Sequence, residues 1–157
     1  MATGAVLGNG TRVGYSPLGS PVAWTRIPQV LEVDFPSESP DKVDKTVHGT
    51  SKYKANFPGM VEVGDLTVRC LADFDEVTSP IYGALQVLHD AQTEIYWRVE
   101  IPTNRAQSRF KPFELYGYIG EVTIGVPIDD KQTIAFSIVH SGTGISRYAT
   151  TGSPSVV

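Results

Sequence analysis

The sequence is poor in the residues on which most metal sites and nucleophilic enzymes depend. Its 157 residues include one cysteine and three histidines. Cys70 cannot form an internal disulfide, and its place in an apolar, strand-like stretch predicts a small core residue. The histidines fall in a loop, at a helix end and at a strand end, and none has a second ligand at metal spacing: His48, His89 and His140. We therefore expect no metal and no cofactor.

Patterns of catalysis are also missing. The sequence contains no G-x-S-x-G turn, no phosphate-binding loop and no Cys-His pair, so we name no catalytic residue and expect no enzyme. Asp73 and Asp75 could form a carboxylate site, but an acidic turn before a helix is the simpler interpretation. A small hydrolase that uses either residue is the weakest hypothesis.

Signals for membranes and nucleic acids are absent or weak. Residues 1–20 lack the charged start and apolar run of a signal peptide, and no stretch is long and apolar enough to span a membrane. The net charge is −4, and no basic patch is dense enough to hold nucleic acid. We expect a soluble protein made in a reducing cytoplasm, with no membrane partner.

One helix is predicted, over residues 78–90. Thr78 or Ser79 can cap its start, and Pro80 stands at the first helical position, where a missing N–H group costs nothing. The apolar residues that follow at helical spacing form one stripe: Ile81, Ala84, Leu85 and Leu88. This stripe must cover another element, because it cannot form a core alone.

The rest of the chain is predicted to form strands. Residues 94–101 alternate, so one face carries Ile95, Trp97, Val99 and Ile101 and the other carries Glu94, Tyr96, Arg98 and Glu100. Further strands are predicted at 12–15, 22–26, 30–35, 60–74 with a kink at Gly64, 113–126 and 132–140. Because no βαβ rhythm is present, these elements predict an antiparallel β-sandwich or barrel flanked by the helix. The predicted core is Leu31, Val33, Phe35, Ile81, Leu85, Leu88, Ile95, Trp97, Val99, Ile134, Phe136 and Ile138.

Three segments have too little apolar surface to belong to this core. Within a single domain, 1–157, they are an N-terminal arm at 1–23, a long polar loop at 36–57 and a flexible or docked C-terminal tail at 141–157. The strands on either side of the polar loop are predicted to form a long hairpin. Such segments are suited to being ordered by other copies of the chain, which suggests a homo-oligomer.

The order and spacing of these elements resemble the tail tube proteins of bacteriophages with long, non-contractile tails. The resemblance covers residues 24–142, through IPQVLEVDFP (27–36), DKVDKTVHGTSKYKANFPGMVEVGDLTVRC (41–70), SPIYGALQVL (79–88), TEIYWRVEIP (93–102) and FELYGYIGEVTIGVPIDDKQTIAFSIVHSG (113–142). It implies a β-sandwich flanked by one helix. It also implies copies that assemble as stacked hexameric rings, whose inner sheets join into a barrel around a lumen.

The same resemblance implies the partners and the place of the protein. The partners are other copies of the chain, a tape-measure protein in the lumen, tail terminator and tail-tip proteins, and DNA only in transit, without sequence-specific binding. The implied place is the virion, after assembly in the cytoplasm of the bacterial host.

Two groups of residues are candidates for these contacts. The resemblance assigns the 36–57 loop to the adjacent ring, through Asp41, Lys42, Asp44, Lys45, His48, Lys52, Tyr53 and Lys54. Acidic groups that line a pore repel phosphate and keep the transit of DNA fast. The lumen-facing candidates are Glu32 and Asp34, with Arg98 and Glu100 after them.

Two other interpretations stay open. A tail terminator, or a tube protein of a contractile tail or secretion system, shares much of this fold. A monomeric β-barrel that binds a small ligand is the alternative from a different class.

Overall fold

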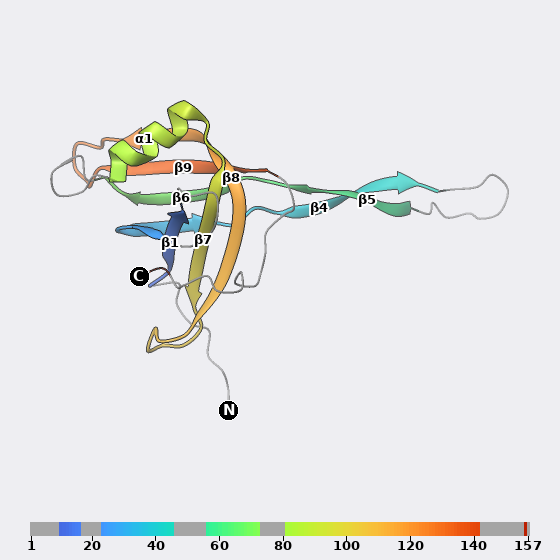
Figure 1. Ribbon diagram of the computed structural model, residues 1–157, viewed down its shortest axis with the longest axis horizontal. Helices are drawn as coiled ribbons and strands as arrows, with labels where there is room; N and C mark the ends of the chain where they lie inside the picture. The colour runs from blue at the N-terminus through green and yellow to red at the C-terminus, as the bar shows by residue number, and fades with distance from the viewer. Residues whose placement is uncertain (1–9, 17–22, 46–55, 73–80, 142–155, 157) are drawn as a thin grey trace.

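The computed structural model describes residues 10–16, 23–45, 56–72, 81–141 and 156. Within these residues the chain forms nine strands and one helix, shown in Figure 1. In chain order they are β1 (Arg12–Ser16), β2 (Thr25–Ile27), β3 (Val30–Asp34), β4 (Glu38–Asp44), β5 (Asn56–Val63), β6 (Leu66–Leu71), α1 (Ile81–Ala91), β7 (Ile95–Pro102), β8 (Phe110–Gly125) and β9 (Thr133–His140).

Seven strands form one antiparallel sheet in the order β2-β1-β7-β8-β9-β6-β3. The sheet bends at β8, whose first half pairs with β7 up to Gly117 and whose second half pairs with β9 from Gly117 to Gly125. A Cβ atom at Gly117 would collide with the Val139 carbonyl oxygen, so this close approach requires glycine. The bend produces two half-sheets whose strands run crosswise in Figure 1.

We name the two half-sheets by what lies over them. The covered half consists of β2, β1, β7 and the first half of β8, and the open half consists of the second half of β8, β9, β6 and β3. The core lies between them, around the fully buried Trp97. The Trp97 ring contacts Tyr15 at 5.7 Å and Phe136 at 5.8 Å between centroids, and its Nε1–H donates to the Gly117 carbonyl at 3.1 Å. Trp97 therefore joins strands of both halves.

The helix closes one side of this core. Leu85 of α1 is buried in the same apolar cluster, Leu88 packs partly buried against it, and the helix contacts β8. The predicted range of 78–90 is close to the observed Ile81–Ala91, and residues 78–80 lie outside the described part of the chain. After the helix ends, Gln92 adopts a left-handed backbone conformation with a φ of 50°.

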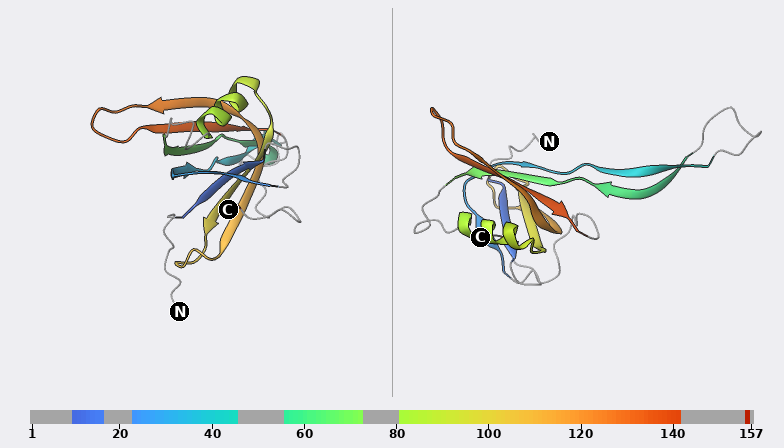
Figure 2. Two further views of the ribbon diagram at one scale, coloured as in Figure 1. Left: turned by 60° about the vertical axis from the view of Figure 1, so that its left-hand side comes forward. Right: turned by 90° about the horizontal axis from the view of Figure 1, so that it is seen from above.

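β4 and β5 form a separate two-stranded ribbon that projects far from the body, as Figures 1 and 2 show. We call this ribbon the arm. It continues the β3–β6 pair, and the Gly64 N–H donates to the Ser37 carbonyl at 3.1 Å where the chain kinks. The predicted long hairpin and the kink at Gly64 are confirmed.

The prediction of a polar loop over 36–57 is wrong for residues 38–44, which form β4. A two-stranded ribbon satisfies its backbone groups by pairing and leaves its side chains exposed, so β4 lacks the alternation that marks a half-buried strand. Residues 46–55 lie outside the described part of the chain. Whether the arm becomes ordered only after assembly is therefore still a prediction.

Two further predictions need correction. The strand predicted at 12–15 is confirmed as β1, but it does not belong to an arm, because it lies inside the sheet between β2 and β7 and buries Val13 and Tyr15. In β3 a bulge lies between Val30 and Glu32, and it takes Leu31 out of the expected alternation. Leu31 and Phe35 are 54% and 38% exposed, so they are not core residues.

The main features of the predicted fold are confirmed. The sheet is antiparallel, it folds into two packed halves and a single helix flanks it within the described residues. The predicted core residues of β7 and β9 are buried, as is Cys70. The described side-chain positions do not include Ile81, the first residue of the helix.

Candidate functional site

The described residues offer no obvious centre for chemistry. Among them, no group of three or more His, Cys, Asp or Glu side chains is placed to hold a metal ion. Asp73 and Asp75, the candidate carboxylate site, lie outside the described residues. In the described part of the chain, no helix is long and apolar enough to cross a membrane. The surfaces of the sheet are therefore the candidate functional sites.

One face of the open half carries no covering element among the residues that the structure describes. The strand registers place its outward side chains in three rows: Asp34, Thr67, Ser137 and Glu121; then Glu32, Arg69, Ala135 and Thr123; then Leu71, Thr133 and Gly125. Most of these side chains are small or polar, and they surround a shallow hollow of about 290 Å³. We call this surface the bare face. Its opposite side is the core face, which carries Val68, Phe136 and Ile138.

The bare face is acidic. It carries three carboxylates, from Glu32, Asp34 and Glu121, against one guanidinium, from Arg69. Arg69 Nη1 lies 3.9 Å from Glu32 Oε2, and both side chains are more than half exposed, so water screens the pair. The structure thus brings Glu32 and Asp34 together with Glu121, a residue that the sequence analysis did not single out.

The prediction that Arg98 and Glu100 face a lumen is wrong. Arg98 is 4% exposed and Glu100 is fully buried, so neither side chain can face a channel. β7 is buried on both faces, because its second face is covered by residues from distant parts of the chain. Val156 lies on this face and is itself fully buried, and the Trp24 ring lies 5.7 Å from the Arg98 guanidinium.

Arg98 is the centre of a buried charge cluster. Its Nε lies 2.9 Å from Glu100 Oε1, and its Nη1 donates to Glu114 Oε1 at 3.0 Å. The Val156 N–H donates to Glu100 Oε1 at 3.0 Å, and Arg12 Nη1 donates to the Val156 carbonyl at 3.1 Å. These contacts fasten the end of the chain to β1 and β7. No local sequence pattern predicts them, because the partners are far apart along the chain.

Gly14 makes the approach of Val156 possible. A Cβ atom at Gly14 would lie 2.9 Å from Val156 Cγ2 and 3.3 Å from the Thr25 carbonyl oxygen. The absence of a side chain on β1 therefore leaves room for the isopropyl group of Val156. Val156 is therefore docked at this point, whereas residues 142–155 and 157 of the predicted tail lie outside the described part of the chain.

The open half has two unpaired edges. Among the residues that the structure describes, β3 pairs only with β6, and β8 pairs only with β9 beyond Gly117. Strand directions alternate across this half, from β3 through β6 and β9 to β8. An exposed edge presents backbone N–H and C=O groups that can pair with another chain.

The arm presents both charges and apolar side chains. Asp41, Lys42, Asp44 and Lys45 of the predicted inter-ring group are exposed on it, whereas His48, Lys52, Tyr53 and Lys54 lie outside the described residues. Lys45 Nζ lies 4.2 Å from the centroid of Phe57. Val43 pairs with Phe57, and both are about half exposed, as is Val61 farther along β5. The sequence analysis did not single out these apolar side chains, because the pairing of β4 with β5 is not visible in the sequence.

Comparisons with known proteins identify the fold. No protein-family model matches the sequence, and no curated protein matches it. Among solved structures, the chain is similar to the SPP1 tail tube, with 11% identity over 94% of this chain and 82% of that one and a TM-score of 0.66. It is also similar to the tail of an empty GTA particle with C6 symmetry, with 14% identity, coverage of 92% and 100% and a TM-score of 0.67.

A third similar structure comes from a contractile system. It is the sheath/tube terminator of the extracellular contractile injection system PVC, with 11% identity, coverage of 93% and 99% and a TM-score of 0.70. At these identities the comparisons establish fold rather than activity. The chain has the fold of tail tube proteins, as the sequence resemblance implied.

Proposed function

We propose that this protein is the structural subunit of a phage tail tube, whose copies close into rings that stack around a lumen. The observation that carries the proposal is the open half-sheet. It has two unpaired edges, one bare face and one core face, in a fold shared with tail tubes. A monomer usually protects such edges, whereas a ring pairs each edge with the next copy.

The strand directions support closure into a ring. The open half contains four strands of alternating direction, so β8 of one copy is antiparallel to β3 of a copy placed beside it in the same orientation. Rotation around an axis then repeats the same antiparallel pairing at every junction. Six copies per ring is the symmetry that we propose, in agreement with the C6 symmetry of the GTA tail.

The bare face suits the wall of a DNA conduit. If the half-sheets join edge to edge with their core faces outward, Glu32, Asp34 and Glu121 face the lumen. Their negative charge opposes the binding of DNA phosphates, so DNA passes without being held. The tape-measure protein would occupy the same lumen before DNA, and terminator and tip proteins would close the two ends.

The arm suits contact between rings. It extends beyond the body, and its apolar side chains Val43, Phe57 and Val61 are each more than half exposed. One arm per subunit gives several equivalent contacts per ring. Several weak contacts that form together bind one ring to the next strongly. We assign the protein to the virion of a phage with a long, non-contractile tail, assembled in the bacterial cytoplasm and without enzyme activity.

Electron microscopy of the purified full chain at high concentration tests this proposal. Long smooth tubes with a central channel are expected. Single closed rings would favour a tail terminator, and tubes that recruit a sheath would favour a contractile system. A stable monomer in light scattering at all concentrations would contradict the proposal and favour the ligand-binding barrel.

A shortened arm tests the ring-to-ring contact. Replacement of residues 40–61 by Asn-Gly joins Ser39 to Glu62, which are already paired, through a tight hairpin turn. The variant is expected to fold and to form rings but no tubes. Phe57→Ser should weaken stacking in the same direction, whereas Glu62→Ser, at the base of the arm and outside the predicted inter-ring group, is the control. Normal tubes from the shortened chain would exclude the arm from stacking.

A further inference from the structure

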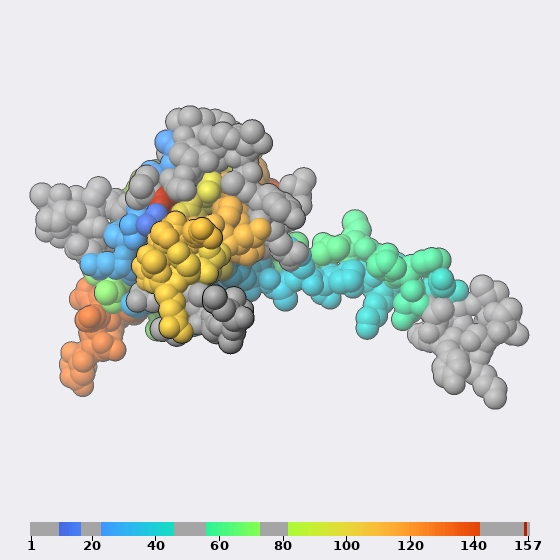
Figure 3. All heavy atoms as spheres, turned by 90° about the horizontal axis from the view of Figure 1, so that it is seen from below, coloured from blue at the N-terminus to red at the C-terminus, as the bar shows by residue number. Residues whose placement is uncertain are grey.

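The β8–β9 hairpin carries apolar side chains that no described residue buries. Ile124, Val126 and Ile128 are 43%, 64% and 99% exposed. They follow Val122, which packs against the core, at intervals of two residues. On β8 this spacing places Ile124 on the core face with Val122, and Val126 and Ile128 follow it in the connection to β9. Figures 2 and 3 show this hairpin, in orange, projecting from the body.

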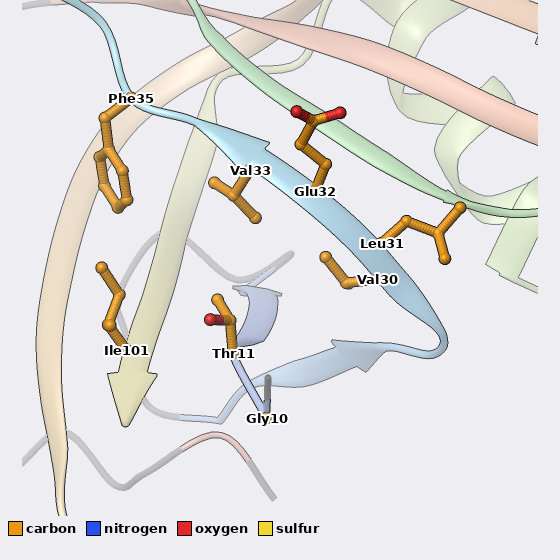
Figure 4. Close-up of a pocket in the computed structure, with 8 residues that line it drawn as sticks. All are labelled: Gly10, Thr11, Val30, Leu31, Glu32, Val33, Phe35 and Ile101. Atoms are coloured by element: carbon orange, nitrogen blue, oxygen red, sulfur yellow. The ribbon is translucent and has the colours of Figure 1, made fainter. Parts of the chain in front are cut away.

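The opposite edge of the open half carries a matching cavity. It has a volume of about 650 Å³, and its apolar lining includes Val30, Leu31, Val33, Phe35 and Ile101. Figure 4 shows Val33 and Phe35 on the side of Thr11 and Ile101, whereas Glu32 points the other way, toward the bare face. The cavity therefore lies on the core face of β3, beside its unpaired edge.

Edge pairing would bring the hairpin and the cavity together. This step rests on the proposed function, in which β8 of one copy pairs with β3 of the next. Across one copy, Ile124 pairs with Ile134, Ile134 with Cys70, and Cys70 with Val30. Ile124 is thus level with Val30 along the rows of the sheet, and in a continuous pleat both lie on the core face. The hairpin beyond Ile124 emerges at the Val30 end of the neighbouring β3.

We propose that the hairpin tip, residues 124–128, packs against the Val30–Leu31 end of the cavity beside β3 of the adjacent copy. The tip carries no charge over these five residues, and the only carboxylate among the cavity residues, Glu32, points away from it. Apolar surface thus meets apolar surface without burial of a charge. The hairpin tip of the same chain lies away from this cavity, because β9 and β6 separate β8 from β3. A second copy is therefore the occupant.

Disulfide trapping tests this contact in the full chain. Ile128→Cys combined with Leu31→Cys should give, on mild oxidation, a ladder of covalent multimers that ends at the ring. Each single variant should give no ladder, and an equimolar mixture of the two should stop at dimers. Cys70 can remain, because burial raises the pKa of its thiol to about 11 and keeps it unreactive at neutral pH.

The control pairs the same hairpin cysteine with an unrelated exposed position. Ile128→Cys combined with Glu62→Cys on the arm should give no ladder. Tubes or rings that form without the Ile128–Leu31 ladder would overturn this inference and leave the proposed function intact. A cross-link confined to the monomer would show that the chain fills its own cavity. A chain that never assembles would overturn both proposals.

A charge at the tip gives a second measurement that does not depend on oxidation. Val126→Asp should raise the protein concentration needed for assembly at least about tenfold, because a carboxylate would enter the apolar cavity. Val87→Asp is the matched control, since Val87 of α1 is 66% exposed against 64% for Val126. Unchanged melting temperatures of both variants would show that folding is intact. Equal assembly by both variants would contradict the contact.

Discussion

The two halves of the sheet use the same alternating pattern for different purposes. In the covered half, β7 buries Trp97 and Val99 on one face and Arg98 and Glu100 on the other. In the open half, β9 buries Phe136 and Ile138 on one face, and its other face belongs to the bare face. The difference arises from Val156 and Trp24, which cover the second face of β7.

This comparison separates the requirements of folding from those of assembly. A strand that is buried on both faces contributes to the stability of the isolated subunit. A strand that is buried on one face leaves the other available to a lumen or a partner. Substitutions in the covered half should therefore change unfolding, and substitutions on the bare face should change transport through the tube.

The largest effect is expected from Trp97→Ala. Trp97 is fully buried between both halves, and loss of a buried tryptophan costs roughly 3–5 kcal/mol of unfolding free energy. Urea unfolding followed by circular dichroism measures the change. Thr123→Ala on the bare face is the control, with an expected change within about 0.5 kcal/mol. Equal stability of Trp97→Ala and the wild type would place Trp97 outside the core.

Arg98→Met should lower the unfolding free energy, measured by urea unfolding, by about 3 kcal/mol or more. The substitution removes the guanidinium that pairs with the buried carboxylates of Glu100 and Glu114. Arg69→Met is the matched substitution on the bare face. It removes only an exposed pair at 3.9 Å, so its effect should stay within about 0.5 kcal/mol. If Arg98→Met and Arg69→Met lowered the unfolding free energy by similar amounts, the proposed difference between the covered half and the open half would be wrong.

Gly14→Ala should have an intermediate effect of roughly 1–3 kcal/mol, because the new methyl group would press on Val156. Val156→Ala in the same chain should recover part of the loss, since it removes the methyl groups that collide. The coupling between the two substitutions, measured from the four unfolding free energies, tests the contact. Strict additivity would mean that Val156 does not rest on Gly14.

The smallest effect on stability is expected from Glu32→Lys combined with Asp34→Lys. Both side chains are exposed, so the unfolding free energy should change by less than about 1 kcal/mol. Tubes should still form, but DNA ejection should slow or stop because lysines on the lumen wall attract phosphate. Ejection at the normal rate would show that this face does not line the lumen.

The sequence predicted the elements whose pattern is local. The alternation of β7 and β9 identified Trp97, Val99, Phe136 and Ile138 as core residues, and Pro80 placed the start of the helix within a residue or so of Ile81. These signals succeed because each side chain's environment follows from its neighbours two to four residues away. The pairing of the strands on either side of residues 36–57 was predicted for the same reason, and β3 pairs with β6.

The failures share a physical cause. The sequence analysis predicted an exposed face for Arg98 and Glu100, because no neighbouring residue in the sequence indicates that Val156 covers them. Leu31 was placed in the core because a bulge cannot be read from alternation alone. The cavity beside β3 and the acidic row that includes Glu121 were missed because each combines residues from strands that only the topology brings together.

The arm and the β3–β6 pair of the open half are mechanically one ribbon. β4 continues β3 and β5 continues β6, and the hydrogen bond from Gly64 to Ser37 carries the pairing across the kink. A pull on the arm from an adjacent ring would therefore load β3 and β6 along their length. Hydrogen bonds loaded in this direction share the force, rather than opening one at a time. When a tail bends, strain between rings would reach the wall of the channel directly, without passing through the helix or the covered half.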